Sequence, residues 1–114
     1  MIKTAEELSL KEWQNSFGKL SYTLTNLKEF PEQNPKLRIY ARVCVQPSEE
    51  VEYHVHHNEC EYYYILSGKG LYRDNEREVV VSAGTVTMTP SGNGHGIRNI
   101  GNEMLEFMAL VLLD

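Results

Sequence analysis

Turn-forming residues divide this chain into short segments, and that punctuation limits its possible folds more than any other feature. From Lys19 onward, runs rich in β-branched and aromatic residues are separated by Gly, Pro, Asn or Asp about every eight to twelve positions, a spacing typical of an antiparallel β-sandwich or barrel. The stretch from Pro90 to Gly94, PSGNG, excludes any regular element. We expect strands at Leu20–Leu24, Leu37–Val45, Val51–His56, Glu61–Leu66, Gly70–Arg73, Glu78–Val81, Thr85–Thr89, His95–Asn99 and Met104–Leu112.

The N-terminal segment has the only helical signal. Thr4 and Glu7 are spaced as in a capping box, ahead of the apolar residues Leu8, Leu10 and Trp13. This pattern predicts one short helix or helical turn. The sequence as a whole therefore predicts an all-β protein of antiparallel strands with a short N-terminal helical segment.

Length and charge narrow the classes of function. A chain of 114 residues is expected to form one domain, residues 1–114, with a core of its own. The net charge is −5 and no block of Lys and Arg is present, which argues against a nucleic-acid partner. The longest apolar stretch, Phe107–Leu113, is much shorter than the ~20 residues of a membrane helix. We expect a cytoplasmic protein with no membrane or nucleic-acid partner.

Three of the four histidines lie between positions 54 and 61, in the sequence HVHHNECE. On a strand, His54 and His56 point to the same side, whereas His57 points away. Glu61 opens the next run, and His95 follows the glycine-rich turn, so a barrel can bring both to the same point. Imidazole and carboxylate groups together suit a divalent transition metal. Two histidines on an exposed strand can also be merely solvated, and the HxH pair alone does not decide between these interpretations.

The spacing of other residues around these histidines resembles the two motifs of the cupin superfamily. The second motif, GX5PXGX2HX3N, is matched at Gly84, Pro90, Gly92, His95 and Asn99. The first, GX5HXHX3-4EX6G, is matched at His54, His56, Glu61 and Gly68, with Ser48 in place of its first glycine. The shorter permitted spacing would put Cys60 at the carboxylate position, so Glu61 is the preferred ligand. Two spaced motifs in the right order make this resemblance specific.

The resemblance implies a small single-domain cupin. Its fold would be an antiparallel double-stranded β-helix, or jelly-roll barrel, with a core at about 37–113 and an N-terminal extension at about 1–36. The implied metal ligands are His54, His56, Glu61 and His95, holding one divalent transition metal: Fe, Ni, Mn, Zn or Cu. The glycines, Pro90 and Asn99 of the motifs would shape the turns around the site. Cupins of this kind are usually dimers.

Residues beyond the ligand set are candidates for substrate binding. Tyr63 shares the face of Glu61, so we place it beside a bound ligand. Tyr40 and Arg42, together with Arg38, share one face of their strand and are candidates for binding a carboxylate from the cavity wall. That face could instead meet solvent or a second subunit. Tyr62 and Tyr64 point away from Glu61, and exposed aromatic residues of this kind favour a homodimer.

Three functions are compatible with these features. The first is a metalloenzyme acting on a small, chelating, anionic or oxygen-bearing substrate, of the dioxygenase or isomerase type. The second is a module that binds or senses a small molecule, such as a sugar or metabolite, without catalysis. The third is a protein whose metal only stabilises the fold. The sequence assigns no catalytic acid or base outside the ligand set.

Overall fold

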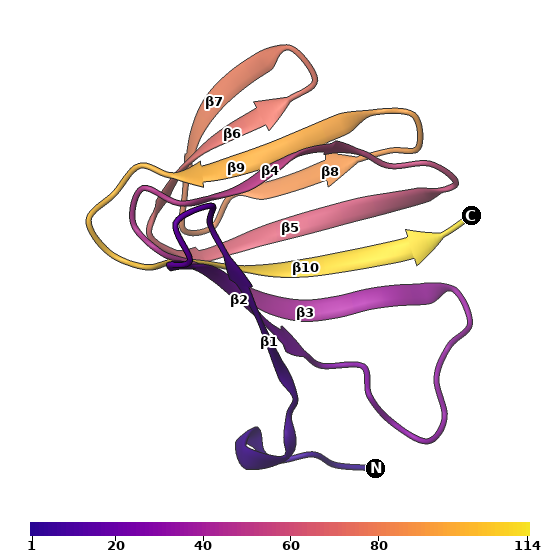
Figure 1. The fold of residues 1–114 in the computed structure, drawn as a ribbon. Helices are drawn as coiled ribbons and strands as arrows, with labels where there is room; N and C mark the ends of the chain where they lie inside the picture. The colour runs from indigo at the N-terminus through magenta and orange to yellow at the C-terminus, as the bar shows by residue number, and fades with distance from the viewer.

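The computed structural model describes residues 1–114 and consists of two antiparallel sheets (Figure 1). The larger sheet has the strand order β1-β2-β3-β10-β5-β8, and the smaller sheet has the order β4-β9-β6-β7. Each of the nine predicted strands is present, within two residues at either end. The strands are β1 (Leu10–Gln14), β2 (Leu20–Asn26), β3 (Leu37–Val45), β4 (Glu50–Val55), β5 (Glu59–Ser67), β6 (Lys69–Asp74), β7 (Arg77–Ser82), β8 (Val86–Thr89), β9 (Gly94–Asn99) and β10 (Leu105–Leu113).

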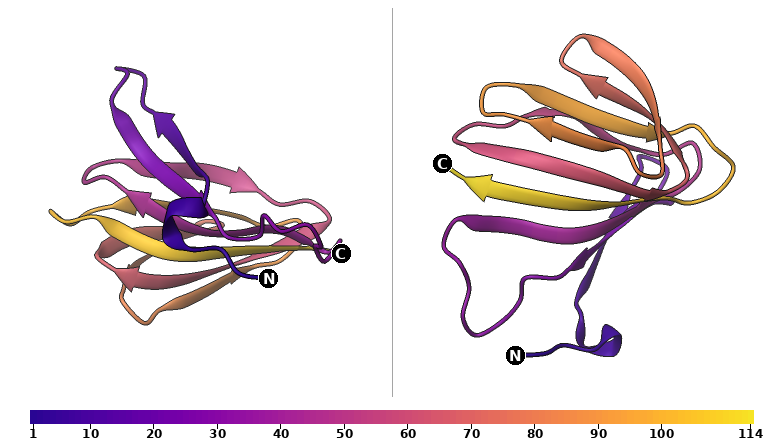
Figure 2. Two further views of the ribbon diagram at one scale, coloured as in Figure 1. Left: turned by 90° about the horizontal axis from the view of Figure 1, so that it is seen from below. Right: turned by 180° about the vertical axis from the view of Figure 1, so that it is seen from behind.

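The core lies between the two sheets, which face each other in both views of Figure 2. Val45, Ile65 and Phe107 of the larger sheet have no exposed surface, and Ile97 of the smaller sheet is 2% exposed. On β10 every second residue is buried, as expected for a strand with one face on the core. The structure therefore confirms the all-β, antiparallel, jelly-roll class.

The N-terminal segment contains the expected helical turn, followed by a strand that was not expected. Only Ala5–Glu7 is helical, a 3-10 turn held by the predicted capping box of Thr4 and Glu7. The chain then forms strand β1, where Trp13 pairs with Tyr22 of β2 and the two rings stack with centroids 4.8 Å apart. This long-range pairing ends the helical turn. No helix in the structure has the length and apolar character needed to cross a membrane.

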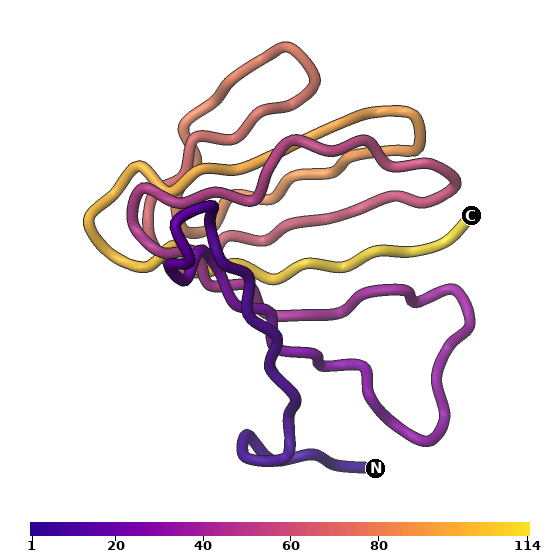
Figure 3. The backbone as a smooth tube through the Cα atoms, in the orientation of Figure 1, coloured from indigo at the N-terminus to yellow at the C-terminus, as the bar shows by residue number.

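Three connections between the strands have features that the sequence explains: the link from β2 to β3 and the turns at Gly68 and Ser48. The tube in Figure 3 shows the long link from β2 to β3 at residues 27–36, which contains Pro31 and Pro35. Gly68 has φ +87°, and a Cβ there would lie 2.6 Å from the Met104 carbonyl oxygen, so only glycine fits. Ser48, which replaces the glycine of the first motif, has φ 68° and so keeps the glycine-like turn.

Candidate metal centre

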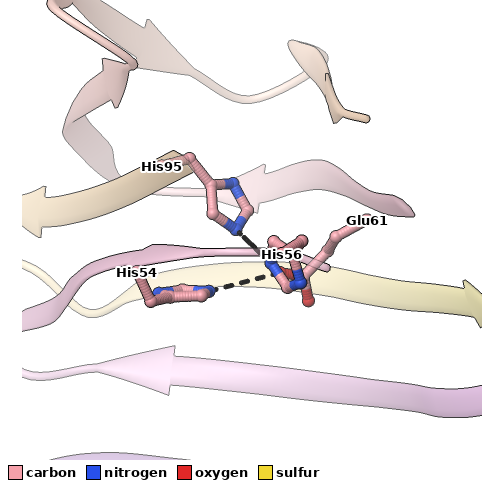
Figure 4. A group of neighbouring side chains, drawn as sticks. All are labelled: His54, His56, Glu61 and His95. Atoms are coloured by element: carbon pink, nitrogen blue, oxygen red, sulfur yellow. Dashed lines mark hydrogen bonds and ion pairs between the residues drawn. The ribbon is translucent and has the colours of Figure 1, made fainter. Parts of the chain in front are cut away.

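The four motif residues converge on one point between the sheets (Figure 4). Strand pairing places His54 of β4 opposite His95 of β9, and His56 follows β4 directly. Glu61 reaches the same point from β5 in the opposing sheet. One ligand atom from each of the four residues lies within 4.8 Å of all the others. His95 has no exposed surface and His56 and Glu61 are each 5% exposed, whereas the side chain of His54 is 39% exposed, so the group is buried on all sides but that of His54.

Hydrogen bonds at Nδ1 orient two of the imidazoles. His54 Nδ1 donates to the Glu52 carbonyl oxygen at 2.7 Å, and His56 Nδ1 donates to Glu59 Oε2 at 2.6 Å. Both partners are acceptors only, so the proton of each ring is on Nδ1. The Nε2 atoms of these rings are left with a free lone pair that faces the centre of the group.

His95 is held in a similar way by a hydroxyl group. Its Nδ1 lies 2.7 Å from the Tyr72 hydroxyl, which lies 3.0 Å from Thr89 Oγ1. The Tyr72 hydroxyl can accept the His95 proton while donating its own to Thr89. Tyr63 stacks on the opposite side of this ring, with centroids 4.7 Å apart. His95 is therefore fixed with Nε2 toward the other ligands.

The distances between ligand atoms fit a bound cation. Glu61 Oε1 lies 2.7 Å from His95 Nε2, 2.9 Å from His56 Nε2 and 3.7 Å from His54 Nε2. The Nε2 atoms of His56 and His95 are 3.1 Å apart. With each Nδ1 protonated, these lone pairs and the carboxylate oxygen meet without a proton between them, an arrangement that a positive ion stabilises. The donor set also matches the imidazole and carboxylate preferences of divalent transition metals.

Electrostatics keep the carboxylate of Glu61 ionised. Burial acts to raise its pKa, but in the metal-free protein the contact with His54, the hydrogen bond with His95 and the charges of the imidazoles when protonated at Nε2 together lower the pKa to about 2. The hydrogen bond to Glu61 raises the pKa of His54, whereas burial lowers the pKa of His95. A metal displaces any proton from Nε2, so in the loaded centre three neutral imidazoles and one carboxylate carry a charge of −1, which a divalent ion converts to +1.

A cavity of about 680 Å³ opens beside this group. His54, His56, Glu61 and Tyr63 form part of its wall, and the Trp13–Tyr22 stack belongs to the part made by the N-terminal strands. Tyr63, which was expected beside a bound ligand, lines the cavity and stacks on His95, with 3% of its surface exposed. The metal group therefore meets a space large enough for a small molecule.

The structure separates the three residues of β3 that were expected to share one face, either of the cavity wall or toward solvent or a second subunit. Tyr40 and Arg42 lie on the outer face of the larger sheet and do not line the cavity; Arg42 pairs instead with Glu106, at 3.4 Å. Arg38 does line the cavity. A register shift pairs Leu112 with Leu37 and leaves Arg38 without an opposite residue on β10, which breaks the alternation.

Two residues that orient the ligands were missed by the sequence reasoning. Glu59 is buried, yet it was assigned to a loop because the strand was expected to begin at Glu61. Its spacing of two from Glu61 was the available signal, since both point to one face. Tyr72 gave no such signal, because its contact with His95 depends on the pairing of β6 with β9.

Comparisons with known proteins agree with this geometry. The family described as "Cupin domain" matches residues 41–111. The "Oxalate-binding protein" of Thermotoga maritima is 40% identical over 114 residues, covering 99% of this chain and 94% of that protein.

Solved structures add to this comparison. The crystal structure of a predicted oxalate decarboxylase from Thermotoga maritima has a TM-score of 0.89 and 36% identity, with both chains covered completely. The cupin domain of Schizosaccharomyces pombe Cnp3 has a TM-score of 0.73 at 22% identity, covering 82% of this chain and 65% of that one, and this likeness concerns the fold alone.

Proposed function

The chain belongs to the cupin family, and from this premise we propose that it binds a divalent transition metal together with a small chelating carboxylate of the oxalate type. The observation that carries the proposal is the convergence of three oriented Nε2 atoms and the Glu61 carboxylate beside a cavity. The fold alone does not decide the function, since one architecture hosts many activities.

His54, His56, Glu61 and His95 would hold the metal. When bound, a divalent ion supplies positive charge and exchangeable positions for ligand oxygens. The protein contributes rigid ligands, because each imidazole has a hydrogen-bond partner at Nδ1 and Tyr63 packs against His95. Tyr63 is also the residue that we propose to pack against the bound ligand.

The charge of the loaded metal centre and the similarity to proteins named for oxalate support an anionic ligand. A net charge of +1 in the loaded centre attracts a carboxylate to the metal itself, since Glu49, Glu50 and Glu52 make the rest of the cavity wall acidic. Arg38 is the only Arg or Lys that lines the cavity. A curated protein and a solved structure that match almost the whole chain, both from Thermotoga maritima, carry names that refer to oxalate. Oxalate chelates metals through two adjacent carboxylate groups, which is the ligand chemistry that we propose here.

The test is metal content followed by ligand titration. Untagged protein should contain close to one equivalent of transition metal by elemental analysis, or take it up after reconstitution with Fe, Ni, Mn, Zn or Cu. The His56→Ala, His95→Ala double variant should lose it, whereas His57→Ala should retain it because His57 is exposed and outside the group. Calorimetric titration should then detect oxalate binding only to loaded protein, with acetate as the single-carboxylate control. Metal-free wild type, or equal oxalate binding without metal, would contradict the proposal.

A second candidate is catalysis at the same centre, of the dioxygenase or isomerase type. The observation that favours it is the cavity, whose volume of about 680 Å³ exceeds what a two-carbon dianion needs. A larger chelating substrate would also contact the Trp13–Tyr22 stack. Oxygen consumption and NMR detection of isomerised products on the loaded protein test it, and assays for formate and CO2 test turnover of oxalate itself. Binding without any of these products would leave the non-catalytic function.

We further propose that a second copy of this chain covers the outer face of the larger sheet. Exposed apolar side chains form one continuous group on the neighbouring strands β3, β10, β5 and β8. They include Tyr40, Tyr62, Tyr64, Leu66, Val86 and Met88. From the size of such side chains their exposed area is on the order of 600 Å², close to the ~800 Å² per partner of a stable interface. The homodimer and the cytoplasmic location stay predictions.

A further inference from the structure

Arg38, Glu59 and His56 form a continuous chain of charged hydrogen bonds. Arg38 Nε lies 2.6 Å from Glu59 Oε1, and Arg38 Nη2 lies 2.9 Å from Glu59 Oε2. Glu59 Oε2 also accepts from His56 Nδ1 at 2.6 Å. The side chain of Arg38 is 48% exposed and that of Glu59 only 12%. The chain therefore leads from the accessible cavity wall to a buried metal ligand.

The partner of His56 differs from those of the other two imidazoles. His54 donates to a backbone carbonyl and His95 contacts a phenol, whereas His56 donates to a carboxylate. An ionised acceptor makes a stronger hydrogen bond and makes Nε2 a better electron donor to a metal. His56 is thus the ligand whose donor strength depends most on a neighbouring residue.

Arg38 has two possible roles that the structure helps to separate. As the only Arg or Lys lining the cavity, it could bind the anionic ligand directly. Its Nε and one Nη are, however, already engaged by Glu59 in the paired geometry that guanidinium and carboxylate groups favour. The Arg38 charge is therefore largely neutralised by Glu59. This arrangement favours a role in holding Glu59.

We propose that Arg38 and Glu59 are positioning residues that set metal affinity through His56. Glu59 keeps the His56 proton on Nδ1 and directs Nε2 to the metal, and Arg38 holds the Glu59 carboxylate in place. The ligand carboxylate is bound without Arg38. This inference rests on the proposed metal centre.

A second ion pair on the same strand supplies the matched control. Arg42 is four residues from Arg38 on β3 and pairs with Glu106 of β10 at 3.4 Å, with its side chain 51% exposed. The two arginines thus have the same chemistry and similar exposure. They differ in that Arg42 lies on the outer face and contacts no member of the metal group.

The experiment compares Glu59→Gln, Arg38→Ala and Arg42→Ala with wild type. Affinity for Zn²⁺ is measured by competition with a chromophoric chelator, and oxalate affinity is measured on metal-saturated protein. We expect metal affinity to fall about 10- to 100-fold in Glu59→Gln and about tenfold in Arg38→Ala. Arg42→Ala should match wild type. Oxalate affinity of saturated Arg38→Ala should stay within about twofold of wild type.

A second readout needs no metal. Long-range ¹H–¹⁵N NMR of the metal-free protein reports which His56 nitrogen carries the proton, and Glu59→Gln should reduce the Nδ1-protonated form relative to wild type. Unchanged metal affinity and tautomer in Glu59→Gln would overturn the inference, as would a loss of oxalate affinity in Arg38→Ala with metal affinity intact. If Glu59→Gln does not fold, the metal and oxalate affinities of Arg38→Ala still test the inference, because the Arg38 side chain is half-exposed. Wild type that binds no metal defeats the proposed function, whereas the tautomer measurement still tests the contact.

Discussion

The two faces of the larger sheet are built from alternate residues of the same strands, yet one face is buried and the other is largely exposed. On β10, Phe107 is fully buried between the sheets while its neighbour Met108 points outward and is partly exposed. On β5, Ile65 is fully buried and the adjacent Tyr64 is 49% exposed. Both faces carry large apolar side chains, so the presence of such side chains alone does not distinguish them. The difference lies in what packs on them: the smaller sheet packs on the inner face, whereas Tyr62 and Tyr64 of the outer face are 38% and 49% exposed.

The largest effect should come from the inner face. Phe107→Ala removes a fully buried ring that packs on Tyr63 with centroids 4.3 Å apart. We expect the free energy of unfolding to fall by about 3–5 kcal/mol, because the ring leaves a cavity that the sheets cannot close. Urea denaturation measures it, with Met108→Ala as the matched control on the outer face. Equal losses in the two variants would remove the distinction between the faces.

The polar end of the inner face should give a pH-dependent effect of intermediate size. The pKa of Glu61 is about 2 in the folded protein against 4.5 for an unperturbed group. A lowered carboxyl pKa stabilises the folded state fully above pH 4.5, and this stabilisation is lost as the pH falls toward 2. The expected loss is about 3 kcal/mol in metal-free protein.

Urea midpoints between pH 7 and pH 2, in the presence of a chelator, measure this loss, and Glu61→Gln should flatten that part of the curve. His54 and His95 act at higher pH and in opposite directions. The raised pKa of His54 favours the folded state below pH 6.5, and the lowered pKa of His95 disfavours it there. If wild type and Glu61→Gln lost the same free energy of unfolding as the pH falls toward 2, the result would argue against an ionised Glu61 carboxylate.

The smallest effect on the stability of one chain should come from the outer face. Tyr64→Lys places a charge where the side chain is already half-exposed, so the monomer's free energy of unfolding should change by no more than about 0.5 kcal/mol. The same change should convert a dimer to a monomer in sedimentation velocity, because a lysine on each copy would be buried at the shared interface. Val80→Lys, at a 54% exposed position on the smaller sheet, should leave the dimer intact. A wild type that sediments as a monomer would show that the outer face is uncovered in solution.

Local patterns predicted much of the fold. The bounds of β3 were predicted without error, and the other expected strands were found within two residues, because turn residues and alternation act over short distances. The pairing of β1 with β2 was not predicted. A capping box at Thr4 favours a helical turn locally, and only the distant partner strand makes Leu10–Gln14 extended.

For the candidate site, the sequence by itself determined the residues with metal-binding chemistry. The spacing of His54, His56, Glu61 and His95 identified a group that the structure brings together. Tertiary structure alone decided which residues orient them: Tyr72 meets His95 because β6 pairs with β9, and Arg38 reaches Glu59 because a register shift interrupts β3. The physical reason is that alternation fixes which way a side chain points along one strand, whereas the strand that lies opposite is set by the packing of the whole chain.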